Sequence, residues 1–387
     1  MKVAIAEPYL QDYTGHYYNV VSELKQGFEK LGDQVSVFVP QDCKAEGCWE
    51  KSMPPQFSGL QRASSLGRII GHYRYILSFA RWLSNIGARH DIIVITSAND
   101  WRIICAASLC QCRKPIYLYL HTLELSKRKT IKRLLRPVLT RRQTSLCFMV
   151  PFPVTKGELR DLIGAVDVPL VDNAPYPIMA PIKIGKYHQE HQGQRLCIAY
   201  LGDARREKGF VSIVDFAVRH SQQYDFIIQC NVPTSGADEP DVAAAIHRLK
   251  GIKRDNVTIL DHPLSNEEYF SWMGKSSVVV CIYDRSAYSH RVSGILLEAF
   301  ALGKPVIVTD GTWLARQVKR YGGGVIIDDP SAENLLAAVE KIKVGYSRFS
   351  TEAAKAGQLL LQTNSGLALA QSVRATLGRD SSGGDQR

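Results

Sequence analysis

The sequence predicts an α/β protein of two Rossmann-like, doubly wound domains that face a cleft. Short apolar runs alternate with stretches of helical periodicity along the first half of the chain, and the same alternation restarts in the second half. The chain has 387 residues, of which 45% are hydrophobic and 22% charged, so it is long enough for two cores. Ligands of such sheets bind at the carboxyl ends of the strands, and we therefore expect the site in the cleft.

The N-terminal domain is expected over residues 1–175. It opens as a βαβ unit, with a loop to Gly15 between the first strand and the first helix. Later short runs are apolar on both faces, which is typical of buried parallel strands. In chain order, the predicted elements are residues 3–6 (strand), 17–31 (helix), 35–39 (strand), 69–83 (helix), 91–95 (strand) and 116–120 (strand).

A proline-containing stretch of little periodicity predicts a linker at residues 176–192, followed by a C-terminal Rossmann-like domain over residues 193–345. We expect residues 346–377 to form helices that return toward the N-terminal domain, and the polar residues 378–387 to form a disordered tail. The elements predicted in the C-terminal domain are strands at residues 196–201, 226–228, 257–260, 278–282, 306–308 and 325–327, with helices at 208–218 and 241–250 among those between them.

Composition excludes several classes of protein. No apolar run approaches the roughly 18 to 20 residues of a membrane-spanning helix. The first residues lead directly into a strand pattern, without the regions of a signal peptide, so we expect a cytoplasmic protein. The nine cysteines show no four-ligand zinc spacing, so we expect packed thiols and no metal site.

The formal net charge is +11, from 48 Lys and Arg against 37 Asp and Glu. This surplus suits a phosphate-bearing ligand, an anionic membrane face or nucleic acid. Residues 127–142 hold eight basic side chains and no acidic one, with apolar residues at helical spacing between them. We expect this segment to be a contact with an anionic membrane surface or a solvated helix face, and we do not expect a nucleic-acid partner.

The loop after the first strand excludes a dinucleotide-binding dehydrogenase. Such enzymes need Gly-x-Gly-x-x-Gly at this point, and the loop holds Gly15 alone. A glycine at a helix start lets backbone N–H groups approach an anion, or it serves only as a turn. Gly15 is therefore a candidate phosphate contact.

The start of the C-terminal domain places three cations between a strand and a helix. Gly202 ends the strand, and Arg205, Arg206 and Lys208 follow it. Arginine offers a planar fork and lysine a point charge, and both suit a diphosphate at a helix N-terminus. The alternative is a solvated charge cluster.

A second polar loop leads into an apolar helix over residues 295–302. This helix carries one carboxylate, Glu298. A carboxylate on a mostly buried helix needs hydrogen-bond donors. The ribose hydroxyls of a ligand would supply them, and so would a hydrogen bond or an ion pair inside the protein.

The run over residues 294–306, Gly-Ile-Leu-Leu-Glu-Ala-Phe-Ala-Leu-Gly-Lys-Pro-Val, closely resembles the signature of retaining GT-B glycosyltransferases of family 4, the glycosyl transferases group 1. That family also has a glycine followed six residues later by Lys-Gly, as at Gly202 and Lys208, and a histidine after a first-domain strand, as at His121. The resemblance covers roughly residues 1–345. It implies the GT-B architecture, with the acceptor bound by the N-terminal domain and a nucleotide sugar by the C-terminal domain.

The resemblance also implies roles for individual residues, all of them in donor binding or transfer. Glu298 would accept hydrogen bonds from the nucleotide ribose, and Lys208 would bind the donor diphosphate. His121 would lie near the transferred sugar, and Gly15 would belong to a loop that closes over the donor phosphate. Three consecutive residues would present their backbone to the phosphates and the sugar, namely Ser293, Gly294 and Ile295.

Two positions depart from the family pattern. The first glutamate of the family's Glu-x7-Glu pair falls eight residues before Glu298, where this chain has His290. The arginine that often follows the strand-end glycine is replaced by Asp203, which leaves Arg205 or Arg206 to supply the diphosphate charge. A histidine can still bind a hydroxyl or a phosphate, so His290 stays a candidate donor contact.

The resemblance implies a retaining, metal-independent hexosyltransferase whose catalytic residues are His121, Lys208 and Glu298. It would move a sugar from a UDP- or GDP-sugar, a co-substrate rather than a cofactor, to a glycan or lipid-linked glycan in polysaccharide biosynthesis. No nucleophile is evident, so we expect same-face attack assisted by the departing phosphate. The alternatives are a nucleotide-sugar epimerase or phosphorylase of the same fold, and a non-catalytic relative that binds nucleotide sugars as a scaffold.

Overall fold

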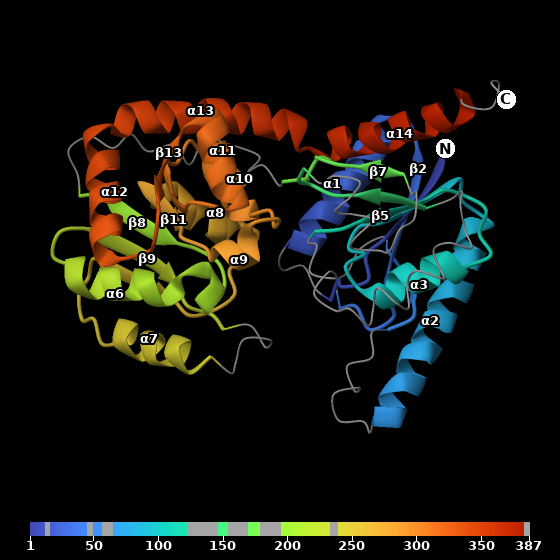
Figure 1. Cartoon of the computed structure of the whole chain (residues 1–387), viewed down its shortest axis with the longest axis horizontal. Helices are drawn as coiled ribbons and strands as arrows, with labels where there is room; N and C mark the ends of the chain where they lie inside the picture. The colour runs from blue at the N-terminus through green and yellow to red at the C-terminus, as the bar shows by residue number, and fades with distance from the viewer. Residues whose placement is uncertain are drawn as a thin grey trace. The chain divides into compact units, whose positions relative to one another are not determined.

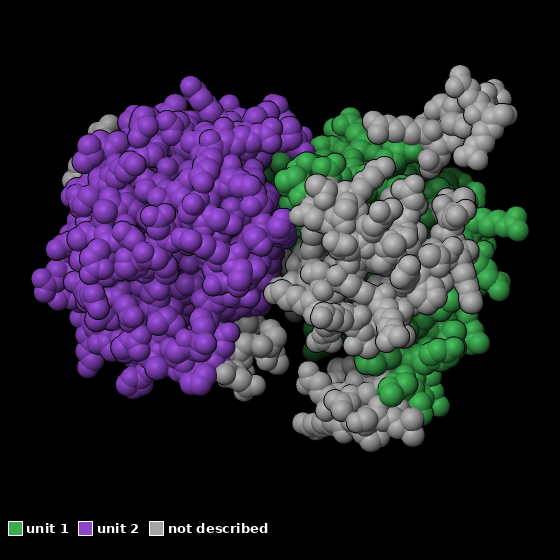
Figure 2. Space-filling view, viewed as in Figure 1, with its two compact units in different colours: residues 1–179, 364–387 green, residues 180–363 purple. Residues whose placement is uncertain are grey.

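The computed structural model describes residues 1–11, 16–44, 49–55, 65–121, 146–153, 169–178, 195–232 and 239–382. The chain divides into two compact units, which Figure 2 shows in green and purple. Unit 1 comprises residues 1–179 and 364–387, and unit 2 comprises residues 180–363.

Unit 1 is built on a seven-stranded sheet in the order β3-β2-β1-β4-β5-β6-β7 (Figure 1). Neighbouring strands pair in parallel throughout. The strand order reverses beside β1, so the carboxyl ends of β1 and β4 form the topological switch point of this sheet. The strands are β1 (Lys2–Ala6), β2 (Gln34–Pro40), β3 (Glu50–Met53), β4 (Ile92–Ile95), β5 (Ile116–Tyr119), β6 (Leu146–Met149) and β7 (Leu170–Val171).

Helices α1 (His16–Lys30), α2 (Ser65–Gly87), α3 (Trp101–Leu109) and α14 (Gly366–Ser382) complete the described part of unit 1. The last of these packs against α1. The two helices approach so closely that a Cβ at Gly27 would lie 2.2 Å from the Gly366 carbonyl oxygen. The end of the chain is therefore part of the N-terminal unit.

An ion pair adds to the attachment of α14. Arg374 donates to the carboxylate of Asp33, whose side chain is fully buried and also accepts a hydrogen bond from the amino group of Met1 at 2.9 Å. Burial raises the pKa of Asp33, but the hydrogen bonds from Arg374 and from the amino terminus outweigh this and hold its pKa below the ordinary value. Asp33 is thus ionised, and its ion pair with Arg374 helps to hold α14 against unit 1.

Unit 2 is built on a six-stranded parallel sheet in the order β10-β9-β8-β11-β12-β13. Its core gathers apolar side chains from the strands and from helices α6, α7 and α12. Its strands are β8 (Cys197–Tyr200), β9 (Asp225–Gln229), β10 (Val257–Leu260), β11 (Val278–Cys281), β12 (Val306–Thr309) and β13 (Gly324–Ile327). Its helices are η4 (Arg206–Lys208), α6 (Phe210–His220), α7 (Pro240–Lys250), α8 (Asn266–Lys275), α9 (Arg285–Tyr288), α10 (Gly294–Ala301), α11 (Trp313–Tyr321), α12 (Ala332–Val344) and α13 (Tyr346–Thr363).

The predicted fold class is confirmed, because each unit is a parallel sheet with helices in the Rossmann-like manner. The C-terminal helices differ from the expectation for residues 346–377. Only α14 joins unit 1, whereas α13 stays in unit 2, where a Cβ at Gly357 would lie 2.0 Å from the Phe300 carbonyl oxygen of α10. The expected tail is also partly wrong, because α14 continues its helix to Ser382.

None of the helices in the described ranges is long and apolar enough to span a bilayer. The eight cysteines in those ranges are free thiols, and seven of them are buried. This agrees with the expectation of packed thiols. Those ranges contain no group of three or more His, Cys, Asp or Glu side chains that could hold a metal ion.

Candidate functional site

The candidate donor site of unit 2 lies at the topological switch point between β8 and β11. Gly202 follows β8 with a backbone φ of +104°, a value that favours glycine. A Cβ at this position would lie 2.9 Å from Ile295 Cδ1 and 3.4 Å from Lys208 Nζ. The structure therefore brings together three predicted donor-binding residues from three elements: the end of β8, the turn η4 and the first turn of α10.

Lys208 supplies the central cation of this site. Its side chain is half-buried, and this burial lowers the pKa of the ammonium group, while the nearby Asp203 acts in the opposite direction. Among the residues that the structure describes, no carboxylate oxygen lies within 4.0 Å of Lys208 Nζ. Lys208 is therefore a partly desolvated cation that forms no ion pair with the described residues. Such a cation is well suited to an anionic ligand.

The two predicted arginines differ in their placement. Arg205 Nη2 lies 2.9 Å from an oxygen of Asp203, the residue that departs from the family pattern. Arg206 is exposed, and its guanidinium lies 2.5 Å from Asp241 on α7. Arg205 therefore lies near enough to Lys208 for its charge to lower the pKa of Lys208. Arg206 instead forms its ion pair with Asp241 on α7.

Arg291 is a cation that sequence reasoning missed. It lies in the loop before α10, its Nη1 is 3.0 Å from a carboxylate oxygen of Glu207, and its guanidinium lies over the ring of Tyr288. Its charge helps to lower the pKa of Lys208, so the two cations share one electrostatic environment. In the sequence, Arg291 could have been predicted as a site residue because it directly follows His290 in the loop before α10.

Glu298 projects from α10 and is half-buried. One carboxylate oxygen, Oε2, accepts a hydrogen bond of 2.5 Å from the hydroxyl of Tyr269 on α8. Burial raises the pKa of Glu298 to about 7. The other oxygen, Oε1, would lie 3.6 Å from a Cβ at Gly294, so it faces the first residue of the helix. The internal hydrogen bond that was the alternative is thus present at Oε2, and among the described residues no such bond is found at Oε1. Tyr269 is a further residue that the sequence analysis did not predict.

The loop before α10 shapes the start of this helix. Ser293 is buried, and its hydroxyl caps the helix by accepting from the backbone N–H of Leu296 at 3.4 Å. Gly294 and Ile295 then form the first turn, whose N–H groups and dipole favour an anion. His290 lies in the same loop, after α9, and is half-buried.

The candidate site of unit 1 is centred on His121, which follows β5. Its Nε2 lies 2.7 Å from the Thr96 carbonyl oxygen and 3.2 Å from the hydroxyl of Ser97. A carbonyl only accepts hydrogen bonds, so this network assigns a proton to Nε2. Three tyrosine rings lie within 6.5 Å of the imidazole, centroid to centroid, and they belong to Tyr17, Tyr119 and Tyr176.

Glu7 is a buried acid at this switch point that sequence reasoning missed. It follows β1, and its Oε2 accepts hydrogen bonds from Thr96 at 2.8 Å and from Ser97 at 2.6 Å, while Oε1 accepts from the backbone N–H of Tyr9 at 2.9 Å. Burial raises the pKa of Glu7 to about 7. The hydroxyl of Ser97 therefore connects Glu7 to His121. In the sequence, Glu7 could have been predicted as a site residue because it directly follows the apolar run of the first strand.

Two predicted features lie outside the described residues. One is Gly15, the candidate phosphate contact, and the other is the basic segment over residues 127–142.

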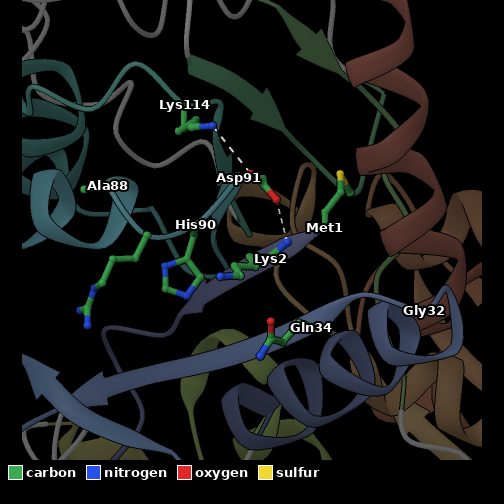
Figure 3. A pocket seen from close by; sticks show the side chains of 9 residues that line it. Met1, Lys2, Gly32, Gln34, Ala88, His90, Asp91 and Lys114 are labelled. Atoms are coloured by element: carbon green, nitrogen blue, oxygen red, sulfur yellow. Dashed lines mark hydrogen bonds and ion pairs between the residues drawn. The ribbon is translucent and has the colours of Figure 1, made fainter.

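An open hollow at the amino edge of the unit 1 sheet, shown in Figure 3, is lined by Met1, Lys2, Gln34, Asp91 and Lys114 among others. Asp91 there accepts from the backbone N–H of Lys2 at 2.8 Å and lies 3.7 Å from Lys114 Nζ. The hollow holds no predicted site residue.

Comparison with protein families shows what unit 2 is similar to. The family described as "Glycosyl transferases group 1" matches residues 255–356, a range that contains Glu298 and the motif over residues 294–306. A search of curated protein sequences finds no match.

Solved structures share the fold of nearly the whole chain. Sucrose-phosphate synthase from Thermosynechococcus elongatus is 15% identical, with a TM-score of 0.68 over 97% of this chain and 98% of that one. Anabaena HepE in complex with UDP and glucose is 13% identical, with a TM-score of 0.66 over 98% and 100%. WaaG, a glycosyltransferase involved in lipopolysaccharide biosynthesis, is 14% identical, with a TM-score of 0.59 over 96% and 98%. Residues 255–356 therefore match the group 1 glycosyltransferase family, in a chain that has the GT-B fold.

Proposed function

We propose that the chain is a retaining, metal-independent hexosyltransferase of the family 4 type that uses a UDP- or GDP-sugar as donor. The observation that carries this proposal is the meeting of Gly202, Lys208 and Ile295 at the switch point of unit 2, one helical turn from Glu298. UDP and glucose in HepE, a protein of the same fold, support a nucleotide sugar as the donor. The acceptor is a glycan or lipid-linked glycan of polysaccharide biosynthesis, in the cytoplasm, and the role of WaaG in lipopolysaccharide biosynthesis supports this class.

In the proposed mechanism, the donor diphosphate lies against Lys208 and the first turn of α10. As the glycosidic bond opens, negative charge grows on the leaving phosphate, and a partly desolvated ammonium with a helix N-terminus stabilises that charge without a metal. Arg205 and Arg291 add positive potential, although Asp203 and Glu207 offset part of it.

The ribose of the donor binds Glu298 through the oxygen that Tyr269 leaves available, Oε1. Tyr269 holds the carboxylate in one orientation, because its hydroxyl donates to the other oxygen. A carboxylate with a raised pKa gains from hydroxyl donors, since they replace the water lost on burial.

The sugar is transferred by same-face attack: the anomeric carbon bonds to the acceptor oxygen as its bond to the phosphate oxygen breaks, and the departing phosphate takes the proton of the acceptor hydroxyl. His121 orients the sugar from unit 1, and the proton assigned to its Nε2 leaves Nδ1 as the basic nitrogen of the neutral imidazole. Gly15 and His290 are the remaining donor contacts in this proposal, as the resemblance implies. That the two units face a cleft at this site is part of the same proposal.

The experiment is a donor-use assay followed by product stereochemistry. Purified protein is screened by thermal shift against UDP- and GDP-sugars, because a ligand that binds only the folded state raises its melting temperature. Lys208→Met and Glu298→Ala should abolish both the shift and the release of the nucleoside diphosphate, whereas Lys341→Met on the exposed face of α12 should change neither. A product with an inverted anomeric centre would overturn the retaining mechanism.

A non-catalytic scaffold is the second candidate, and the ion pair between Arg205 and Asp203 favours it. That pair occupies the guanidinium which would otherwise face the diphosphate. Thermal shifts with nucleotide sugars, without any turnover or hydrolysis, would establish this alternative.

A further inference from the structure

Helix α2 of unit 1 exposes a stripe of large apolar side chains. The exposed fractions are 65% for Ile69, 44% for Ile70, 65% for Tyr73 and 38% for Leu77. Ile69, Tyr73 and Leu77 follow one another at intervals of four residues, which places them on one face of the helix, and Ile70 lies beside them. The first turns of α2 extend beyond the sheet of this unit in Figure 1.

The opposite face of α2 already belongs to the core of the unit. Tyr75, Phe79, Trp82 and Leu83 are buried there. The exposed stripe is therefore additional apolar surface, and folding of the unit does not account for it. Large exposed apolar residues that are contiguous on one face are typical of an interaction surface.

The charged side chains that α2 places beside the stripe are basic. Arg74 and Arg81 are exposed, and each follows a stripe residue by four positions, Ile70 and Leu77 respectively. Helix α2 contains no Asp or Glu from Ser65 to Gly87.

The adjoining helix α3 does not reverse this sign. Its N-cap, Asp100, accepts a hydrogen bond of 2.8 Å from Nε of Arg102, so the carboxylate is already paired. The surface of α2 thus combines aliphatic and aromatic side chains with two arginines that form no ion pair with any residue in the described ranges.

We propose that this α2 face, Ile69, Ile70, Tyr73 and Leu77 with Arg74 and Arg81, docks on an anionic lipid bilayer. The four apolar side chains enter the boundary between headgroups and acyl chains, and the arginines lie at the level of the lipid phosphates. Tyr73 suits that boundary because its ring is apolar and its hydroxyl polar.

The shape and charge of the surface favour a bilayer over a protein partner. A single helix face is convex, and a bilayer accepts a convex apolar stripe without a preformed groove. The arginines are complementary to anionic headgroups, which surround an inserted helix on both sides. This docking goes beyond the proposed transfer reaction and does not depend on it, because a vesicle without any donor or acceptor is a sufficient ligand.

The test is co-sedimentation of the full chain with vesicles of phosphatidylcholine, with and without phosphatidylglycerol. Wild type should sediment with the anionic vesicles, and high salt should weaken this binding. The combined change Ile69→Ser, Tyr73→Ser and Leu77→Ser should lower the partition coefficient at least about tenfold, because it removes most of the inserted apolar area. Arg74→Gln with Arg81→Gln should lower it by about fivefold per arginine.

A matched control removes exposed apolar side chains from unit 2. Val344 is 89% exposed and Leu359 is 44% exposed, so Val344→Ser with Leu359→Ser changes apolar side chains of comparable exposed fraction and should leave vesicle binding unchanged. Both sets of variants replace exposed residues, and an unchanged melting temperature checks that each remains folded.

Three outcomes would overturn the proposal. Wild type could fail to bind anionic vesicles, or the α2 variants could bind them as wild type does. The apolar variant could instead convert a dimer to a monomer in light scattering while vesicle binding persists, which would assign the stripe to a second copy of the chain. If the α2 variants lose vesicle binding but keep the thermal shifts with nucleotide sugars, the docking proposal is supported. If wild type binds vesicles but shows no thermal shift with any nucleotide sugar, only the proposed function is contradicted.

Discussion

Substitution of Glu7 by glutamine should make unit 1 more stable at alkaline pH and should remove a pH dependence that wild type shows. Burial raises the pKa of Glu7 from 4.5 to about 7, so the folded state holds a proton that the unfolded state has released. The stability that this proton supplies is present below the unfolded pKa and is lost as the pH rises through about 7. Glutamine cannot ionise, so the variant lacks this loss.

The magnitude follows from the two pKa values. A difference of about 2.5 pH units at about 1.36 kcal/mol each gives about 3 kcal/mol between acidic and alkaline limits. A stability change of that size shifts the melting temperature of a domain of this length by roughly 6 to 12 °C. Glutamine keeps the hydrogen bond from the backbone of Tyr9 through its carbonyl oxygen, and its amide can donate to the hydroxyls of Thr96 and Ser97, so the site stays satisfied.

The assay is thermal unfolding of wild type and Glu7→Gln from about pH 5 to about pH 8.5, with hydrogen exchange to assign each transition to a unit. The protection of β1 peptides in wild type should fall with rising pH relative to the variant, while that of β11 peptides should not. Glu298→Gln is the matched control, because burial raises the pKa of Glu298 to the same value in unit 2, so it should reverse this pattern. A stability difference between wild type and Glu7→Gln that is constant over this range would refute the reasoning.

Three further substitutions test other features. Gly202→Ala forces a methyl group into a positive φ and to within 2.9 Å of Ile295 Cδ1, so it should cost about 1 to 3 kcal/mol of stability and weaken UDP binding in calorimetry; unchanged UDP affinity would contradict the proposed donor site. Gly357→Ala places a methyl group 2.0 Å from a carbonyl oxygen of α10, so the free energy of unfolding of unit 2, measured in urea, should fall by about 3 kcal/mol. A fall of less than about 0.5 kcal/mol would show that α13 can shift freely. Arg374→Met should cost about 2 kcal/mol near neutral pH, and the difference should shrink as Asp33 protonates below its unfolded pKa; α14 amides that exchange as in wild type would argue against this role of the ion pair.

The features that sequence reasoning predicted correctly are those with local signals. Buried parallel strands such as Val278–Cys281 consist of apolar residues on both faces, so they are recognisable one by one. Gly202 and Ile295 each belong to a short motif at the end of a strand or the start of a helix, and their role as donor contacts stays a prediction. The structure adds that the side chain of Ile295 lies against the backbone of Gly202, since a Cβ at Gly202 would be 2.9 Å from Ile295 Cδ1.

The features that sequence reasoning missed depend on contacts between distant parts of the chain. Strand β3, Glu50–Met53, begins with two exposed charged residues and becomes a strand only through pairing with β2. Ser97 meets Glu7 across 90 positions of sequence, so no local pattern could reveal that pair. Arg206 was a reasonable diphosphate ligand by spacing, but Asp241 on a neighbouring helix engages its guanidinium.

The close crossing of α1 and α14 has a consequence for the order in which the protein folds. Residues 366–382 are synthesised after unit 2, yet they complete unit 1, whose other elements are synthesised before unit 2. During translation the surface of α1 around Gly27 therefore stays uncovered until the whole of unit 2 has been made. Domains of a growing chain generally fold as units, so unit 2 can close before the unit that precedes it in sequence. Helix α14 thus makes the maturation of unit 1 conditional on translation past the whole of unit 2.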